Sequence, residues 1–276
     1  MGGPSRILWD TGGLTFENFR LIRPGLGGLR VGAEGRFPFK GLADLEVVVE
    51  NLDVSRVSHL FRWDESLKGI VDLAFNLTGN DSDPKMVGEI GINGFQYRDY
   101  FFEELEIEGR YSGKELSGDI GFGDGTEEYL SIVGMIPIDL SIDRVSKRLL
   151  DEEIEVFVTA ASAPFSLLMA PFDSYQEVQG EISGQVKFGG TLDKLSPEGE
   201  MVLIDGGAFA PGLGVRHENM FGLSTWAPDG QVEIEIIAES EGEASVQGSV
   251  GIGEVTNPDL DLEVNFQQFQ AKIAQT

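Results

Sequence analysis

Apolar and polar residues alternate with a period of two along much of this chain. In Val232–Ile236, which reads VEIEI, the apolar side chains fall on one side and the glutamates on the other. The same alternation recurs in Leu105–Glu108 and in Ile136–Ile142. Because successive side chains of a β-strand point to opposite faces, each segment predicts a strand with one apolar face and one acidic or polar face.

Dipeptides typical of tight turns lie between these alternating segments. They are Asn93-Gly94, Asp124-Gly125, Asp205-Gly206 and Asp229-Gly230. Such pairs tolerate the positive φ angles that short hairpins require. Strands joined by hairpins predict a long antiparallel meander.

Three strand-like segments recur at a nearly constant spacing. Leu45–Val49, Ile154–Val158 and Leu262–Phe266 begin 109 and then 108 positions apart. Further downstream, Leu67–Leu73 corresponds to Ile182–Phe188. Glycine-rich β sequence produces single short matches by chance, but several matches in the same order and at one offset indicate an internal repeat.

A short stretch of helical periodicity follows the first two copies. After the first copy, Val54, Val57 and Phe61 fall at i, i+3 and i+7, and Asp53 is placed to cap a helix. After the second copy, apolar positions with helical spacing follow an early proline: Pro164, Phe165, Leu168, Met169 and Phe172. The third copy reaches the matching position at residues 271–273. We therefore expect a short helix in each repeat.

These correspondences divide the chain into one partial unit over residues 1–44, a complete unit over 45–153, a nearly complete unit over 154–261, and a truncated start over 262–276. Residues 1–276 are accordingly predicted to form a single elongated β segment. Because the chain begins and ends inside repeat units, we expect it to be a segment of a longer array. The alternative architecture is a solenoid, but ordinary solenoid repeats of about 20–30 residues are far shorter than the spacing seen here.

The charge balance narrows the range of partners. With 47 acidic against 20 basic residues, the formal net charge is -27. Such a surface repels nucleic-acid phosphates and anionic headgroups, so we expect no nucleic-acid partner. No apolar run approaches the roughly 18 residues of a membrane span. The first residues lack the basic and apolar regions of a signal peptide.

Candidate chemistry is sparse. The chain has no cysteine and only two histidines, His59 and His217. Nucleotide-loop, serine-hydrolase and zinc-protease motifs are absent, and Arg30 occupies the third-glycine position of the Gly25–Arg30 loop. The acidic loop residues do not have the spacing of a calcium loop: Asp81, Asp83, Asp124, Glu127 and Glu128. We therefore predict a protein that is not an enzyme and carries no metal or cofactor.

The order of these features resembles the repeating part of the TamB branch of the AsmA-like envelope proteins. The resemblance rests on the strand Leu45–Val49, the Asn51-Leu52-Asp53 step, the short apolar helix, and the steps Gly79…Pro84…Gly88 and Gly190…Pro197…Gly199. It covers residues 7–273. The family's amino-terminal membrane anchor and far carboxy-terminal partner-binding region have no counterpart in these residues.

The resemblance implies an all-β fold: an elongated, curled antiparallel β-sheet that forms a taco-like groove, built from repeats of about 109 residues with short helices. It also implies residence in the periplasm, with an inner-membrane anchor in the full-length protein. The implied role is to conduct phospholipid between two membranes, to support outer-membrane protein assembly, or both. Phospholipid acyl chains are then the partners, and an outer-membrane barrel protein is contacted through regions outside this chain.

Alternation selects the residues expected to line such a groove. They are Leu45, Val47, Val49, Val71, Leu73, Phe75, Leu105, Ile107, Ile154, Val156, Val158, Val186, Phe188, Val232, Ile234 and Ile236. The alternative is that these side chains pack against one another in the closed core of a structural or adhesive β-repeat scaffold. A third possibility is a chaperone surface that pairs with unfolded strands at its edges.

Overall fold

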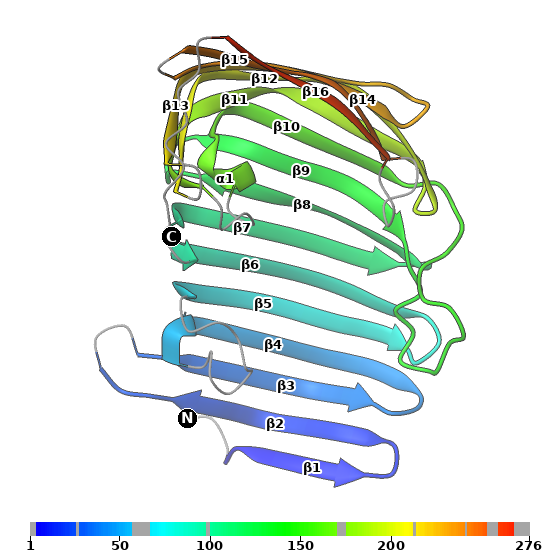
Figure 1. Cartoon of the computed structure of the whole chain (residues 1–276). Coiled ribbons are helices and arrows are strands. Elements are labelled where there is room, and N and C mark those ends of the chain that lie inside the picture. The colour runs from blue at the N-terminus through cyan, green and yellow to red at the C-terminus, as the bar shows by residue number, and fades with distance from the viewer. Residues whose placement is uncertain are drawn as a thin grey trace, which may run out of the picture. The chain divides into compact units, whose positions relative to one another are not determined.

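The structure, a computed structural model, describes residues 4–25, 28–56, 67–97, 100–169, 175–211, 214–240, 242–252 and 259–267. Sixteen strands form one antiparallel sheet, in which strands adjacent in sequence are adjacent in the sheet (Figure 1). Strands β1 and β16 end the strand order, so the sheet is open and does not close into a barrel. The predicted all-β antiparallel meander is therefore confirmed.

Most strands are long, with nine to seventeen residues, and β1 has only five. Their bounds are β1 (Arg6–Asp10), β2 (Gly13–Ile22), β3 (Arg30–Pro38), β4 (Leu42–Asp53), β5 (Lys68–Asn80), β6 (Pro84–Tyr97), β7 (Tyr100–Ser112), β8 (Glu115–Gly123), β9 (Glu128–Pro137), β10 (Glu155–Pro164), β11 (Gln176–Thr191), β12 (Lys194–Ala210), β13 (Val215–Trp226), β14 (Gln231–Ser240), β15 (Gly242–Gly251) and β16 (Asp259–Gln267). Two short helical elements complete the described fold: the 3₁₀ helix η1 (Val54–Arg56) and α1 (Ser166–Met169).

The chain divides into two compact units. Unit 1 comprises Met1–Glu128 and Val133–Leu150, and unit 2 comprises Tyr129–Ile132 and Asp151–Thr276. Each has its own apolar core on its strands. In unit 1 the buried residues that cluster together are Ala43, Leu45 and Leu77. In unit 2 they are Ala160, Ala163, Ile182 and Leu203.

Two of the four predicted hairpin turns are confirmed, and two are wrong. Asp124-Gly125 joins β8 to β9, and Asp229-Gly230 joins β13 to β14. Asn93-Gly94 instead lies inside β6 and Asp205-Gly206 inside β12, and the pairing register shifts there. A β-bulge needs the same positive φ as a tight turn, and Gly94 and Asp205 have φ of 62° and 50°. Each dipeptide therefore bends a long strand without ending it.

The predicted helices are only partly within the described residues. Asp53 accepts hydrogen bonds from the Ser55 N–H and hydroxyl and so caps η1, as expected of a capping residue. Val57, Phe61, Phe172 and residues 271–273 lie outside the described residues.

The predicted position of Pro164 at the start of the second helix is wrong, because Pro164 is the last residue of β10. The next N–H, of Phe165, still donates across the sheet to Gly180 O at 2.8 Å. Only then does α1 begin, at Ser166.

The predicted strand over Ile136–Ile142 is also wrong beyond Pro137, where β9 ends. Ile138 makes only an isolated bridge with Leu149. We call residues 138–150 the strap. Its polar residues Asp139 and Ser141 are buried.

Candidate apolar binding face

In unit 1 the strand register aligns apolar residues into rows that cross the strands. In an antiparallel pair, directly opposed residues lie on the same face of the sheet. One row crosses all strands from β1 to β8: Ile7, Phe16, Gly35, Leu45, Leu77, Met86, Tyr111 and Leu116. This row is therefore continuous across the strands, although its residues are far apart in the sequence.

Three further rows lie on the same face of unit 1. The rows are Phe19, Ala33, Val47, Phe75, Gly88, Gly109 and Gly118; Leu21, Val31, Val49, Leu73, Ile90, Ile107 and Ile120; and Leu52, Val71, Ile92, Leu105 and Phe122. We call the four rows together the apolar face of unit 1.

Unit 2 repeats this arrangement on its own strands. Its rows are Val158, Val186, Gly199, Trp226, Val232, Val250 and Leu260; Ala160, Gly184, Met201, Ser224, Ile234, Gly248 and Leu262; Ile182, Leu203, Gly222, Ile236, Val246 and Val264; and Val156, Phe188 and Pro197. The second row is interrupted by one polar side chain, Ser224. The remaining members are apolar residues or glycines.

Fifteen of the sixteen predicted lining residues fall in these rows. In unit 1 they are Leu45, Val47, Val49, Val71, Leu73, Phe75, Leu105 and Ile107, and in unit 2 they are Val156, Val158, Val186, Phe188, Val232, Ile234 and Ile236. Ile154 is buried just before β10, and its N–H donates to Gly190 O at 2.8 Å. All sixteen side chains are buried or half-buried.

Sequence reasoning missed many members of the rows. The aromatic and aliphatic residues that it missed include Phe16, Phe19, Leu77, Ile90, Ile92, Ile120, Phe122, Met201, Leu203, Trp226, Val246 and Val250. Several of them alternate with glycine in place of a charged residue, as in Ile90-Gly91-Ile92 and Ile120-Gly121-Phe122. Apolar–glycine alternation is the signal that would have identified these segments.

Glycines in the rows have two different roles. Gly35 has φ of 102°, and a Cβ there would lie 1.8 Å from Asp44 O on the next strand. Gly35 is therefore required by the backbone. Gly109 has no atom within 4 Å of its Cβ position, so it leaves space on the apolar face beside neighbouring rows.

The opposite face of the strands is acidic. Glu108 on β7 lies between Glu89 on β6 and Asp119 on β8, and Glu34 lies opposite Glu46. Like charges in direct cross-strand pairs repel each other. Because this face is solvated, the repulsion is moderate, and it keeps a large sheet soluble and discourages association between sheets.

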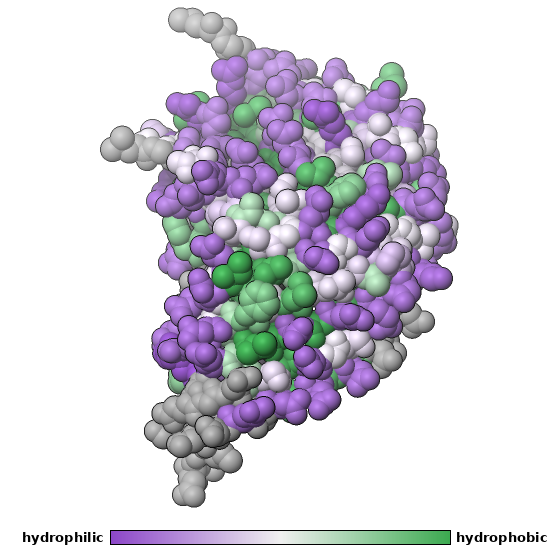
Figure 2. Space-filling view, turned by 90° about the horizontal axis from the view of Figure 1, so that it is seen from above, coloured by the Kyte–Doolittle hydropathy of each residue, from purple (hydrophilic) through white to green (hydrophobic). Residues whose placement is uncertain are grey.

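Apolar side chains are exposed at both ends of the strand order. Ile7 and Trp9 of β1 are 54% and 79% exposed, and Leu260 of β16 is 61% exposed. Seen from above, the surface carries hydrophobic patches bordered by hydrophilic residues (Figure 2). Within each unit, the apolar rows therefore reach an edge strand without being covered there.

The strap covers one margin of the apolar face of unit 1. Ile142 packs against the cluster of Ala43, Leu45 and Leu77. The Leu140 N–H donates to the Tyr111 hydroxyl at 2.9 Å, and Tyr111 belongs to the apolar row that contains Leu45. This margin is where the β3–β4, β5–β6 and β7–β8 turns lie.

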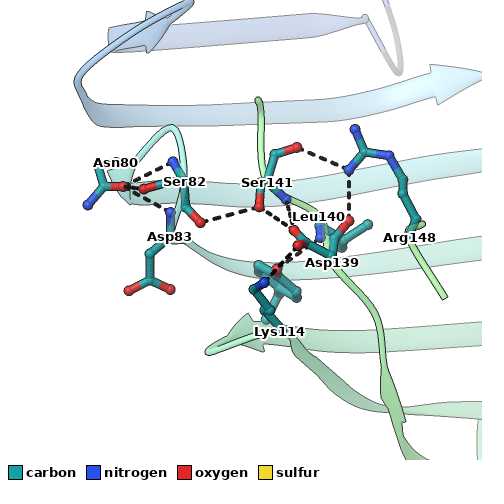
Figure 3. Close-up of polar contacts among 9 residues, drawn as sticks. Asn80, Ser82, Asp83, Lys114, Asp139, Leu140, Ser141 and Arg148 are labelled. Atoms are coloured by element: carbon teal, nitrogen blue, oxygen red, sulfur yellow. Dashed lines mark hydrogen bonds and ion pairs between the residues drawn. The ribbon is translucent and has the colours of Figure 1, made fainter. Parts of the chain in front are cut away.

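A buried polar network holds the strap in place (Figure 3). Asp139, 4% exposed, pairs with Lys114 of the β7–β8 turn, 3.0 Å between Nζ and Oδ2. The Ser141 hydroxyl lies between two acceptors, Asp139 Oδ1 and Ser82 O of the β5–β6 turn, and shares its one hydrogen with them. Arg148 Nη1 donates to the Asp139 and Ser141 carbonyl oxygens at 2.7 and 3.0 Å. Lys114 and Ser82, which are distant in sequence, and Arg148, near the end of the strap, explain why the polar residues of this segment are buried.

The network also sets the charge state of Asp139. Hydrogen bonds from the Ser141 hydroxyl and N–H, together with the Lys114 ammonium, lower the pKa of Asp139 to about 2. In the β8–β9 turn, the Thr126 hydroxyl and the N–H groups of Glu127 and Thr126 lower the pKa of Asp124 to about 2. Both carboxylates are therefore charged over the whole physiological range and act as fixed acceptors.

Three pockets lie among the described residues, and two of them include members of the apolar rows: Leu52 in the first, and Ile234 with Gly248 in the second. A pocket of about 510 Å³ is lined by Arg23, Pro24, Gly25, Gly28, Leu29, Asn51, Leu52, Asp53, Arg56 and Ile70. In unit 2, one of about 520 Å³ lies among Glu233, Glu235, Asp261 and Glu263, and one of about 820 Å³ lies beside the bulge at Asp205. The first is distinguished by two arginines.

Within the described ranges, no group of three or more acidic or histidine side chains is arranged to hold a metal ion. His217 lies on β13, where burial lowers its pKa, and His59 lies outside the described residues. In that same part of the chain, no helix has the length and hydropathy needed to cross a membrane. Comparisons with protein-family models, with curated proteins and with solved structures found no match.

Proposed function

We propose that the chain is a non-catalytic binding segment that carries phospholipid acyl chains along its apolar faces. The observation that carries the proposal is the set of apolar cross-strand rows in an open sheet. In a closed core, apolar side chains are covered on all sides. Here the rows run to edge strands whose apolar side chains are exposed.

The energetics favour a repeated surface over a single tight site. Exposing one buried CH₂ to water costs about 0.8 kcal/mol, so moving a sixteen-carbon chain into water costs about 12 kcal/mol. A continuous apolar surface lowers this cost at every point along its length. A tight site would slow passage, so a row of similar shallow contacts suits movement better than one deep pocket.

The order of elements supports the proposed repeat. After β4 come η1 and the strands β5–β9, and after β10 come α1 and the strands β11–β15. Each set is therefore a strand, a helical turn and five further strands. We propose that such repeats continue in a longer periplasmic protein of the TamB type, with an inner-membrane anchor and a curled, taco-like groove.

Site-specific photocrosslinking tests the proposal directly. A crosslinker at Leu73, Val156 or Ile234, on the apolar faces, should capture phospholipid in cells. A crosslinker at Glu233, next to Ile234 on the opposite face of β14, is the matched control and should capture none. Lipid captured only from Glu233 would overturn the proposal.

A substitution pair provides a second test. In the full-length protein, Leu73→Asp should interrupt the apolar path and reduce lipid transfer, whereas Ala74→Asp, on the exposed face of the same strand, should not. Circular dichroism of both variants shows whether the sheet is retained. Normal lipid transfer by a folded Leu73→Asp variant would contradict the proposal that acyl chains move along the apolar face.

A second candidate function, support of outer-membrane protein assembly, is favoured by the edge strands. β16 exposes Leu260, Leu262 and Val264 along its length, and one side of an edge strand offers backbone groups for pairing. Capture of an unfolded barrel polypeptide at β16, with no lipid on the apolar faces, would support this function in place of the first.

A further inference from the structure

The pocket at Arg23 and Arg56 is chemically unlike the rest of this acidic chain. Its walls combine two arginines with apolar groups from Pro24, Leu29 and Leu52. Acidic residues outnumber basic ones by 47 to 20 in the whole chain, but the pocket contains two guanidinium groups and one carboxylate. Its local formal charge is therefore positive, and its walls match a ligand with an anionic part and an apolar part.

The local backbone places these groups together. The Arg23 N–H donates to Leu29 O at 2.9 Å, which closes the β2–β3 connection on one side of the pocket. Arg56 follows the end of β4, and its Nε donates to Asp53 Oδ2 at 2.7 Å. A guanidinium has five N–H donors, so the Asp53 contact orients Arg56 and leaves donors for a second oxyanion.

The pocket adjoins the apolar face of unit 1. Leu52 is part of the pocket wall and also lies opposite Val71 in an apolar row. From Leu52 the face continues along β4 to Ala43, a distance of about 30 Å for nine strand residues. At that far end the strap packs Ile142 onto Ala43 and Leu45. The two margins of the face therefore differ: one is covered by the strap, and the other has the arginine pocket.

We propose that this pocket holds the anionic phosphate headgroup of an amphiphile whose acyl chain lies on the apolar face of unit 1. The inference rests on the proposed function and specifies the orientation of the ligand. The headgroup lies at the Arg23 and Arg56 margin, and the chain points toward the strap. In the opposite orientation the phosphate would lie beside the Asp139 carboxylate and the apolar Ile142, where Lys114 already pairs with Asp139 and Arg148 already donates to the Asp139 and Ser141 carbonyl oxygens.

Binding of two detergents with the same chain tests the proposal. Dodecyl phosphate has an anionic head and dodecyl maltoside an uncharged one, and each is titrated below its critical micelle concentration. The double variant Arg23→Gln/Arg56→Gln should bind dodecyl phosphate about tenfold more weakly or worse, because charge-assisted hydrogen bonds are lost. Its affinity for dodecyl maltoside should not change. Arg110→Gln, an exposed arginine on β7, is the matched control and should bind both as the unaltered protein does.

Other outcomes overturn the inference in distinguishable ways. Unchanged dodecyl phosphate binding by the double variant, with both detergents weakened by Leu73→Asp, would remove the headgroup site but leave the apolar face. Equal weakening of both detergents by the double variant would show that the arginines act only on the fold. Inorganic phosphate that binds as tightly as dodecyl phosphate, with no effect of Leu73→Asp, would make the pocket a free-phosphate site. If the unaltered chain binds neither detergent, the proposed function fails as well.

Discussion

Lys114 Nζ lies 3.0 Å from Asp139 Oδ2, and this ion pair joins the β7–β8 turn to the strap. Only 4% of Asp139 is exposed, and its other carboxylate oxygen accepts from the Ser141 N–H and hydroxyl. We predict that Asp139→Asn lowers the melting temperature by several degrees, because one partner of a buried network is neutralised. Asp143→Asn, at an exposed position of the same strap, is the control and should leave the melting temperature unchanged.

The Asp139 contribution should also depend on pH. Its pKa is about 2, below the ordinary value of 3.8, so the folded state favours the charged form. The contribution of charged Asp139 to the free energy of unfolding is therefore fully present above about pH 4. It is lost as the pH falls from about 4 towards 2. Melting curves across this range should show a difference between the unaltered chain and Asp139→Asn that is constant above pH 5 and shrinks below pH 4. Asp124, whose pKa is also about 2, is present in both proteins, so its contribution cancels from the difference between their melting temperatures. A difference that does not vary with pH would contradict the assigned charge state.

Two glycines on β3 should respond oppositely to the same substitution. At Gly35, φ is 102° and an added Cβ would lie 1.8 Å from Asp44 O, so Gly35→Ala should cost about 2–4 kcal/mol of unfolding free energy. At Gly32 the closest atom to an added Cβ is 4.0 Å away, so Gly32→Ala should be neutral or slightly stabilising. Urea unfolding of both variants measures the difference. Equal effects would show that the β3–β4 register is misassigned.

Burial predicts the effect of truncating apolar residues on neighbouring strands. Leu77 is 2% exposed in the core of unit 1, so Leu77→Ala should cost about 2–5 kcal/mol. Val87, on β6, is 45% exposed, and Val87→Ala should change the unfolding free energy by less than about 0.5 kcal/mol. Urea unfolding, followed by a spectroscopic signal from residues of unit 1, measures the change in unfolding free energy of both variants. A similar small effect at both positions would mean that the face around Leu77 is not packed in solution.

The carboxylates on the opposite face should make stability depend on salt. Glu108 lies between Glu89 and Asp119, so Glu108→Lys replaces two repulsive pairs with attractive ones and should add about 0.5–1 kcal/mol. Glu200→Lys, between the uncharged Gln185 and Thr225, should have little effect. Added sodium chloride should raise the melting temperature of the unaltered chain and reduce the advantage of Glu108→Lys, because screening weakens exposed pairs. An advantage that is independent of salt would not be electrostatic.

Local patterns identified the strands well and their ends poorly. Alternation at Leu105–Glu108 and Val232–Ile236 correctly located strands β7 and β14. Asn93-Gly94 was wrongly predicted as a turn because a bulge and a turn require the same backbone conformation. Whether the chain reverses or continues there depends on whether neighbouring strands extend past that point, and no local pattern contains that information.

Ile136–Ile142 shows the same limit for side chains. Its alternation is as regular as that of a real strand, yet the burial is inverted, with Asp139 and Ser141 inside. Their burial is stabilised by Lys114, Ser82 and Arg148, which other turns and the far end of the strap bring near. A buried carboxylate is tolerated only with such partners, so the pattern alone predicted the opposite.

The amino-acid sequence was sufficient for the all-β character, the antiparallel meander and the two-faced strands, because these depend on side-chain alternation within a few residues. It was also sufficient to place most of the proposed lining residues in the apolar rows of their own unit. The registers that join Leu45 to Leu77 and Leu73 to Ile90, the burial of the strap, and the pocket shared by Arg23 and Arg56 depend on contacts between distant segments. Such contacts form only when the strands pair, since pairing decides which residues face each other and which charges share a pocket.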